Sequence, residues 1–333
     1  MTIREQTEQL EKNTLSKYAA LSSQTAGRDF PHEKCPLRTE FQRDRDRILH
    51  SRSFRRLMNK TQVFLLPDGD HYRTRLTHTL EVSQIARTAA RALNLNEDLT
   101  EAIALGHDLG HTPFGHAGED VLQKVCPHGF LHNVQSVRVV ERLENYGKGL
   151  NLTKEVRNGI LCHSHAAGQI ATTFEGQIVR FADKIAYMNH DIDDAVRANV
   201  MSESDVPWNV RLGLGVTKSE RITSLVKNLV ENSVDSIRFD TGHQALYDEL
   251  RSFMFEAVYT NPVAKREESK AMQMVEQLYF YFVKNVNALP QEFKDIAEKE
   301  GVDRAVCDYI SGMSDRFCIL TYKNLFLPQA WAL

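Results

Sequence analysis

Hydrophobic residues recur at helical spacing through most of the chain, from about residue 41 onwards. Between residues 76 and 93 apolar side chains return every three to five positions, as on the buried face of a helix: Leu76, Leu80, Ile85, Ala89 and Leu93. The pattern predicts further helices near 132–146, 153–163, 175–199, 219–235, 243–259, 267–287, 290–298 and 302–312. Valine and isoleucine rarely alternate with polar residues, so we expect an all-α fold without a substantial sheet.

Turn-forming residues mark the expected ends of two helices near residue 110. A helix over about 97–110 is expected to end at Gly110, because glycine commonly follows the last helical turn. Thr112 and Pro113 suit the cap and first position of a helix that reaches about Val125. The segment 202–218 holds one proline and two glycines and is expected to be a loop.

These patterns divide the chain into three regions. Residues 1–40 are polar and are expected to form a short helix followed by an extended N-terminal arm. The arm has too few apolar residues to fold alone. Residues 41–200 form the expected helical core, and residues 201–333 a C-terminal helical region packed on it.

The composition is that of an ordinary globular protein. With 333 residues, of which 42% are hydrophobic and 26% charged, the chain can bury a large core. A net charge of −3 gives no indication of bulk nucleic-acid binding. The 5 cysteines are widely spaced, which is typical of reduced thiols in a cytoplasmic protein. The N-terminus lacks the apolar stretch of a signal peptide, and no run approaches the roughly 20 apolar residues of a membrane span, so we expect no membrane association.

Four residues are candidate ligands of a divalent metal ion. His78 is expected to face inward from its helix, His107 and Asp108 lie near the expected end of the next helix, and Asp183 lies in an apolar helical segment. A buried carboxylate or imidazole needs a partner, and two of each suit Mg, Mn or a similar transition metal. The alternative is that each is a hydrogen-bonded core residue; their placement on consecutive inward faces favours the metal.

Together these residues match the H…HD…D pattern of the HD phosphohydrolase superfamily. Further segments resemble the bacterial deoxyguanosinetriphosphate triphosphohydrolases (dGTPases) and their dGTPase-like relatives: 38–48, 53–57, 60–64, the sequence HDLGHTPFGHAGE at 107–119, and DYISGMSDR at 308–316. The resemblance covers nearly the whole chain. It implies an all-α HD-domain fold with residues 41–200 as the catalytic core, a divalent metal, and release of tripolyphosphate from a deoxynucleoside triphosphate (dNTP).

His116 and Glu119 are candidates for proton transfer. They are three positions apart, so on a helix they share a face and can hydrogen-bond. The spacing suits a general acid for a leaving 5′-oxygen as well as a structural pair at a helix start. The resemblance implies that both are catalytic. It also places His111 in the catalytic set, where it supports phosphate contact, and implies that His132 faces the phosphates.

Other residues are candidates for holding the substrate. Arg75 and Lys184 lie beside predicted metal ligands and can bind phosphate, although solvated cations are the ordinary alternative. Tyr187 and Asp191 continue the face of Asp183; the ring can pack on the sugar, or in the protein core, and the carboxylate can accept from the 3′-hydroxyl. By resemblance Gln62 also contacts the sugar. We interpret His163 and His165 as supporting or structural residues.

The predicted partners are a dNTP substrate and further copies of the chain. Relatives assemble as closed, even-numbered homo-oligomers, so the resemblance implies a dimer of dimers or a hexamer, with the arm of residues 1–40 ordered on a neighbour. Residues 38–60 hold eight Lys or Arg and three acids, which favours internal ion pairs over a nucleotide-effector or single-stranded DNA patch. Two alternatives remain: another HD-type nucleotide phosphohydrolase, and a non-enzymatic nucleotide or DNA sensor.

Overall fold

The computed structural model describes residues 1–62, 73–164 and 168–328. Within these ranges the fold is all-α, as predicted, and the β-type pairing is an isolated bridge between Thr61 and Thr74. In chain order the helices are α1 (Ile3–Thr14), α2 (Glu40–Leu49), α3 (Arg52–Arg56), α4 (Arg75–Ala92), α5 (Glu97–Gly106), α6 (His116–Val125), α7 (His132–Arg138), α8 (Glu144–Gly147), α9 (Lys154–Cys162), α10 (Phe174–Arg197), α11 (Trp208–Leu214), α12 (Lys218–Asn232), α13 (Thr241–Met254), α14 (Pro262–Lys284), α15 (Gln291–Glu300), α16 (Val302–Ser311) and α17 (Asp315–Phe326).

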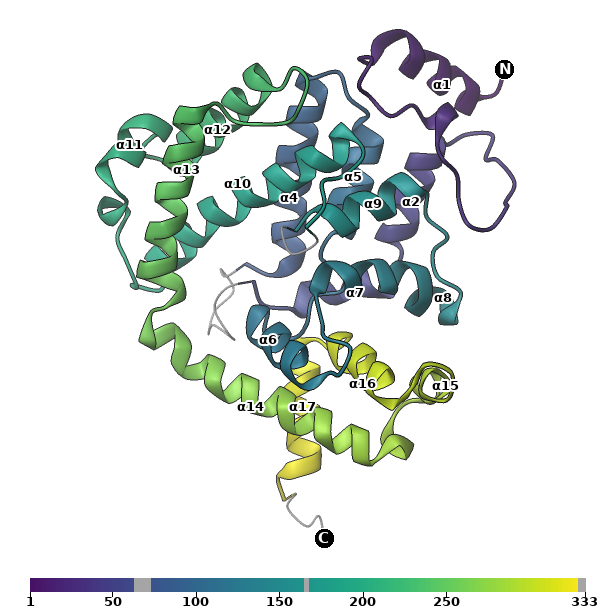
Figure 1. Cartoon of the computed structure of the whole chain (residues 1–333), viewed down its shortest axis with the longest axis vertical. Helices are drawn as coiled ribbons and strands as arrows, with labels where there is room; N and C mark the ends of the chain where they lie inside the picture. Colours follow the sequence, from purple (N-terminus) through teal and green to yellow (C-terminus); the bar gives the residue numbers. More distant parts are fainter. Residues whose placement is uncertain (63–72, 165–167, 329–333) are drawn as a thin grey trace.

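The larger hydrophobic core lies around α4, α5 and α10. Helix α4 packs against both of the others, α2 covers α5, and α9 packs against α10 (Figure 1). Val82, Ile103 and Ile178 are almost completely buried there, at the meeting of α4, α5 and α10. The same apolar cluster continues into α11, α12 and α13. This core therefore fixes the three helices that carry the predicted metal ligands.

A second hydrophobic core holds α6 against the C-terminal helices. Leu122 of α6, Leu278 of α14 and Ile310 of α16 are fully buried in one cluster. In Figure 1 these helices form the lower part of the molecule, with α15 and α17 beside them. The helix that begins at His116 is thus positioned by residues more than 150 positions later in the chain.

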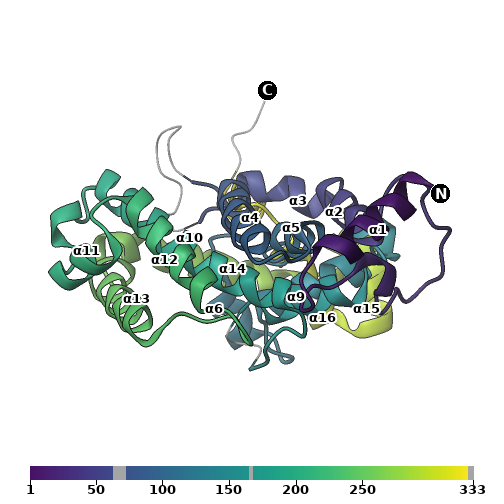
Figure 2. The ribbon, with the colours of Figure 1, turned by 90° about the horizontal axis from the view of Figure 1, so that it is seen from above.

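The N-terminal arm lies against its own chain. Tyr18 stacks on Phe174 with ring centroids 4.9 Å apart, and Asn96 donates to the carbonyl oxygen of Ala20 at 3.0 Å. Arg28 forms an ion pair with Asp44 in the start of the core. Figure 2 shows this segment at one end of the molecule, far from α11 at the other. Contacts with a neighbouring subunit are therefore not needed to order the arm.

The turn around residue 110 differs from the prediction. Helix α5 ends at Gly106, before the predicted end, and α6 begins at His116 with Gly115 as its N-cap at φ 60°. A Cβ at Gly110 would lie 2.2 Å from the backbone nitrogen of Ser136, so this glycine permits a close approach to α7 and does not stop a helix. Thr112 does not cap α6 by its hydroxyl in the predicted way; it donates to the carbonyl oxygen of Gly115 at 2.7 Å.

Three further expectations were wrong. Leu80 is 50% exposed, because it lies about 200° around the helix from His78, and the buried face runs through Val82 and Ile85. The expected loop at 202–218 contains α11, an amphipathic helix too short to give a clear periodic signal. Helix α17 was not predicted, because only a narrow stripe of its side chains is buried.

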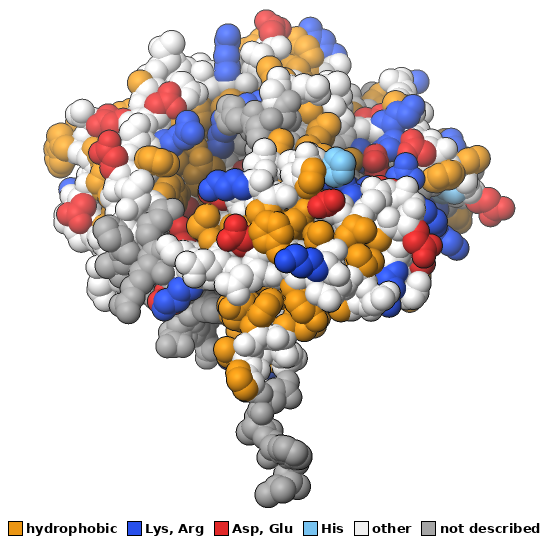
Figure 3. Space-filling model, turned by 60° about the horizontal axis from the view of Figure 1, so that its bottom comes forward, with side chains coloured by type: hydrophobic (Ala, Val, Ile, Leu, Met, Phe, Trp, Pro, Cys, Tyr) orange, Lys and Arg blue, Asp and Glu red, His pale blue; other side chains and the backbone are white. Residues whose placement is uncertain are grey.

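The lower face of the molecule exposes apolar side chains. Phe280 of α14 and Phe317 and Leu320 of α17 are each 45–51% exposed. Figure 3 shows hydrophobic side chains gathered on this face, close to the C-terminal end of the chain. Surface clusters of this kind are typical of contact surfaces.

Candidate active site

The predicted site residues surround one cavity of about 600 Å³ between α4, α10, the 107–120 segment and the turn that precedes α14. All of them line it except His107 and Glu119, which lie directly behind its wall. Its lining includes three of the predicted metal ligands, His78, Asp108 and Asp183, and also the predicted proton donor, His116. The fold thus brings to one cavity residues that are spread from position 62 to position 191.

The four predicted metal ligands converge in space. The Nε2 atom of His78 lies 3.1 Å from Oδ1 of Asp183 and 3.9 Å from Oδ2 of Asp108. The Nε2 atom of His107 lies 3.5 Å from the same Asp108 oxygen and 3.9 Å from Oδ1 of Asp183. Separations of this size are those of donor atoms around one ion with bonds of about 2.0–2.2 Å.

An unpartnered atom shows that a metal ion fits this position. His107 uses its Nδ1 atom to donate to the carbonyl oxygen of Ala104 at 2.6 Å, which leaves Nε2 with a lone pair. This Nε2 atom is buried and finds no hydrogen-bond partner within the described ranges. A buried polar atom without a partner is costly, and a cation among two imidazoles and two carboxylates would satisfy it.

Both carboxylates of this cluster are held ionised. Burial opposes the charge of Asp108, but nearby positive charge, that of Arg75 included, outweighs it and keeps the pKa of Asp108 well below its usual range. Burial likewise opposes ionisation of Asp183, and the hydrogen bond from His78 keeps its pKa low. Arg75 donates to Oδ2 of Asp108 at 2.6 Å, so this predicted phosphate ligand also steadies a predicted metal ligand.

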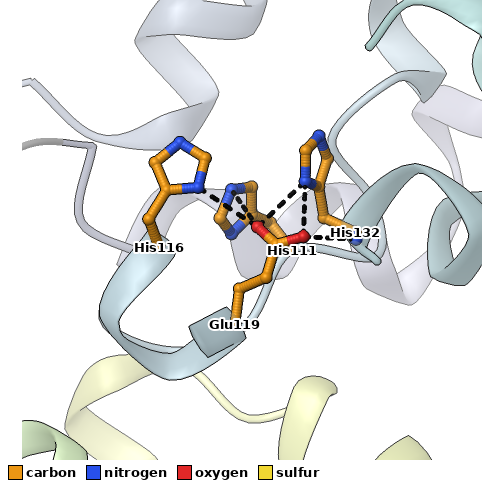
Figure 4. Close-up of side chains that lie close together, drawn as sticks. All are labelled: His111, His116, Glu119 and His132. Atoms are coloured by element: carbon orange, nitrogen blue, oxygen red, sulfur yellow. Dashed lines mark hydrogen bonds and ion pairs between the residues drawn. The ribbon is translucent and has the colours of Figure 1, made fainter. Parts of the chain in front are cut away.

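Glu119 is the centre of a second cluster, formed with three histidines (Figure 4). His116 approaches it through Nδ1 at 3.1 Å, and His132 binds it through Nδ1 at 2.9 Å and through its backbone amide at 2.8 Å. The Nε2 atom of His111 lies 3.9 Å away. Burial acts to raise the pKa of Glu119, but its hydrogen bonds with His116 and His132 hold it far below the usual range.

The histidines of this cluster differ in charge and exposure. The side chain of His116 is 76% exposed, whereas His111 and His132 stack inside with ring centroids 4.8 Å apart. Burial, with Arg75 nearby, holds the pKa of His111 well below its usual value. Burial opposes the charge of His132, but Glu119 raises its pKa overall. The cavity therefore has a neutral imidazole beside one that tends to be cationic.

His163 lines the cavity between the two clusters. Its Nδ1 atom donates to the carbonyl oxygen of Ile160 at 2.6 Å, and its Nε2 atom lies 3.3 Å from Nε2 of His132. Burial, with His107 and His132 nearby, lowers the pKa of His163 to about 3. The supporting role of His163 stays a prediction, and its donor atom also lies within 4.8 Å of those of Asp108 and His132. His165 lies outside the described residues.

Helix α10 supplies the remaining predicted contacts. Lys184 lines the cavity, and burial lowers its pKa to about 8. The hydroxyl of Tyr187 lies 3.1 Å from that of Tyr247, with its ring toward the cavity wall. Asp191 is almost completely buried at the cavity edge, where both its oxygens already accept hydrogen bonds from protein donors. From the other wall Gln62 contributes a buried Oε1 atom without a partner in the described part of the chain.

Several residues that shape the site were not singled out from the sequence. Asp315 accepts from the backbone amides of Thr61 at 2.9 Å and Phe114 at 3.0 Å. Lys60 is buried, and its Nζ atom donates to the carbonyl oxygens of His111 and Ser311. Burial lowers the pKa of Lys60 well below its usual value. The only sequence signal for these contacts was the resemblance of the segments at 60–64 and 308–316 to the dGTPases.

Comparison with known families identifies both halves of the structure. Residues 75–188 match the HD domain, and residues 237–324 match the phosphohydrolase-associated domain. HD domains bind divalent metals, which agrees with the cluster of His78, His107 and Asp108. None of the helices in the described ranges is long and apolar enough to span a membrane.

Close relatives align over almost the whole chain. Proteins described as deoxyguanosinetriphosphate triphosphohydrolase-like are 57% identical in Caldanaerobacter subterraneus, over 99% of this chain and 98% of the relative, and 46% identical in Clostridium tetani, over 99% and 97%. The fold is similar to that of a phosphohydrolase from Bacteroides thetaiotaomicron, with a TM-score of 0.51 and 16% identity over 84% of this chain and 68% of the other. The protein is therefore an HD-domain phosphohydrolase and belongs to the deoxyguanosinetriphosphate triphosphohydrolase-like family.

Proposed function

We propose that the protein is a metal-dependent dNTP triphosphohydrolase, which converts dGTP or several dNTPs to deoxynucleoside and tripolyphosphate. One observation carries the proposal: Asp108 joins two chemically different clusters at the cavity. Its donor atom lies within 4.8 Å of those of His78 and His107, and also of those of His132 and His163. His132 in turn binds Glu119, the partner of His116. This arrangement supports a metal centre next to a proton-transfer pair.

The four predicted ligands would hold the ion, and the structure favours the metal-binding state of three of them. When bound, a divalent ion supplies Lewis-acid chemistry that acidifies a water molecule and neutralises phosphate charge. His107 presents an unprotonated Nε2 atom, and Asp108 and Asp183 are ionised. Ligand groups prepared in this way need little reorganisation.

The remaining residues bind the phosphates and move the proton. A water molecule attacks the α-phosphorus as the bond between this phosphorus and O5′ breaks, and His116 gives its proton to O5′. The proton that the water loses passes to solvent, from which His116 is reprotonated. With both ring nitrogens protonated, His116 donates from Nδ1 to Glu119 and from Nε2 to O5′, so Glu119 orients the ring for proton transfer. Lys184, Arg75, His111 and His132 supply positive charge or hydrogen bonds along the triphosphate. The sugar lies toward Tyr187, Asp191 and Gln62.

A panel of dNTPs and ribonucleotides, assayed with Mg²⁺, Mn²⁺ and Co²⁺, tests the proposal. We expect deoxynucleoside and tripolyphosphate as the products. Pyrophosphate or orthophosphate would instead indicate another HD-type nucleotide hydrolase. Binding of nucleotide or single-stranded DNA with no turnover under any metal would indicate a sensor.

We also propose that the protein works in the cytoplasm as an even-numbered homo-oligomer, a dimer of dimers or a hexamer. The exposed apolar side chains of α14 and α17, among them Phe280 and Phe317, support an assembly through this face (Figure 3). A nucleotide or single-stranded DNA effector stays a prediction from the basic residues of segment 38–60, where we favour internal ion pairs. Light scattering that finds only active monomer at micromolar concentration would contradict the assembly.

A further inference from the structure

A chain of buried hydrogen bonds leads from a metal ligand to the far wall of the cavity. The Nδ1 atom of His78 lies 2.8 Å from Nε2 of His190, and Nδ1 of His190 lies 2.9 Å from Oδ1 of Asp191. The hydroxyl of Tyr259 donates to the other Asp191 oxygen at 2.5 Å. His78, His190 and Asp191 are each at most 3% exposed.

We propose that His190, Asp191 and Tyr259 act as positioning residues that orient His78 and set the metal affinity of the centre. The inference rests on the metal-binding part of the proposed function and not on the identity of the substrate. It assigns a role to His190 and Tyr259, which have none in the proposed reaction, and a second role to Asp191.

When both imidazoles are neutral, the donors and acceptors of this chain can be ordered in only one direction. A carboxylate only accepts, so Asp191 takes hydrogen bonds from the Tyr259 hydroxyl and from the Nδ1–H of His190. A neutral His190 then has a lone pair on Nε2, which accepts from the Nδ1–H of His78. His78 is left to bind a cation through Nε2, the atom that faces Asp183. This relay, which runs from Tyr259 through Asp191 and His190 to His78, thus selects the tautomer of His78 in which Nε2 is free to bind a metal ion.

Other contacts around His190 do not supply the same constraint. Its backbone carbonyl accepts from Arg73 at 3.3 Å, which fixes the main chain but not the ring. The nearest further carboxylate, Glu81, lies 3.8 Å from Nε2, beyond hydrogen-bond distance. The ring orientation therefore depends on His78 on one side and Asp191 on the other.

The outer end of the relay belongs to a different part of the fold. Tyr259 is the last residue of a π-helical turn, Phe255–Tyr259, that joins α13 to α14. Such turns often mark functional positions in helical proteins. Tyr259 and Asp191 both line the cavity. The geometry of His78 is therefore supported from the C-terminal region and not by α4 and α10 alone.

Calorimetric titration of the full-length, metal-free protein with Mn²⁺ and with Co²⁺ tests the relay. Removing an outer partner of a metal-binding histidine weakens affinity by about 10–100-fold, and we expect His190→Leu to do so. Tyr259→Phe, one step further out, is expected to weaken it by about 3–10-fold. His190→Gln keeps an amide near Nε2 that can accept from His78 and should recover part of the loss. The visible spectrum of bound Co²⁺ should change in His190→Leu, because the ligand field reports on His78.

Tyr247→Phe is the matched control, because it removes a buried tyrosine hydroxyl that bonds Tyr187 and not the relay. It should keep wild-type metal affinity, and its metal-free thermal midpoint should match that of Tyr259→Phe. Wild-type affinity and Co²⁺ spectra in both His190→Leu and Tyr259→Phe would overturn the relay while leaving the metal centre intact. Failure of the wild-type protein to bind either ion would overturn the metal centre itself.

Discussion

Asp315 accepts a hydrogen bond from the backbone amide of Phe114, 201 positions earlier in the chain, at 3.0 Å. Phe114 has a φ of 62°, which is unfavourable for a phenylalanine, and it lies in the turn between the metal ligands and His116. The same carboxylate binds Thr61. The first residue of α17 therefore holds the catalytic turn in place.

Replacing Asp315 should loosen this turn without touching the metal ligands. Asp315→Ala leaves buried amides without an acceptor and should lower the free energy of unfolding by about 1–3 kcal/mol. Turnover should fall while metal affinity stays near that of the wild type. Urea unfolding and calorimetry measure the two effects, with the exposed Asp295→Ala as control. Equal stability of the two variants would show that Asp315 does not hold the turn.

The general-acid role of His116 predicts a defect in chemistry alone. His116→Ala should lower kcat by about 10²–10⁴-fold, since that is the usual contribution of a general acid. The metal content should not change, because His116 is 76% exposed, hydrogen-bonds Glu119 and is not one of the four predicted metal ligands. Turnover and metal content are measured on the same preparation. A variant with wild-type kcat and bound metal would show that another group protonates O5′.

The aromatic ring of Tyr187 is predicted to select deoxyribose over ribose by steric contact. A ring close to C2′ leaves no room for a hydroxyl, so Tyr187→Ala should raise KM and reduce the preference for dGTP over GTP. Tyr187→Phe is the matched control, because it loses only the hydroxyl that contacts Tyr247. It should keep the preference. If the wild type lacks a preference, or if Tyr187→Ala retains it, other residues select deoxyribose.

Glu119 should make the protein sensitive to acid. Its pKa is lower in the folded protein than in the unfolded chain, because its hydrogen bonds with His116 and His132 outweigh the effect of burial. Its ionisation therefore stabilises the fold above the unfolded value of about 4.3, and this contribution is lost as the pH falls below it. The free energy of unfolding of Glu119→Gln should depend less steeply on pH than that of the wild type between about pH 6 and about pH 3. Parallel curves would contradict this assignment.

The helices, and the inward placement of the predicted metal ligands, could be predicted because their signals are local. Periodic apolar residues predict α9 and α10 within a few positions, and the inward face of α4 follows from the position of His78. The ends of α5 and α6 could not be predicted, because Gly110 is needed for the approach of α7, which only the tertiary fold reveals.

The supporting contacts of the site had no comparable signal. His190 follows Asp183 by two helical turns, but Tyr259, the partner of Asp191, lies 68 positions after Asp191. In the sequence Lys60 is one of several cations in a basic segment, and nothing distinguishes it from its neighbours. In the fold it is buried and donates to the carbonyl oxygen of His111. Pairings at such separations are set by the packing of whole helices and leave no periodic pattern in the sequence.

The most direct measurement is the product ratio of dGTP hydrolysis by metal-loaded wild-type protein and by Asp108→Asn. Asparagine preserves the volume of Asp108 but removes the charge that contacts His107 and Arg75. The account predicts deoxyguanosine and tripolyphosphate in equal amounts from the wild type, and neither product nor bound metal in the variant, with helical content retained. Release of pyrophosphate or orthophosphate by the wild type, or full turnover by a metal-free Asp108→Asn protein, would contradict it.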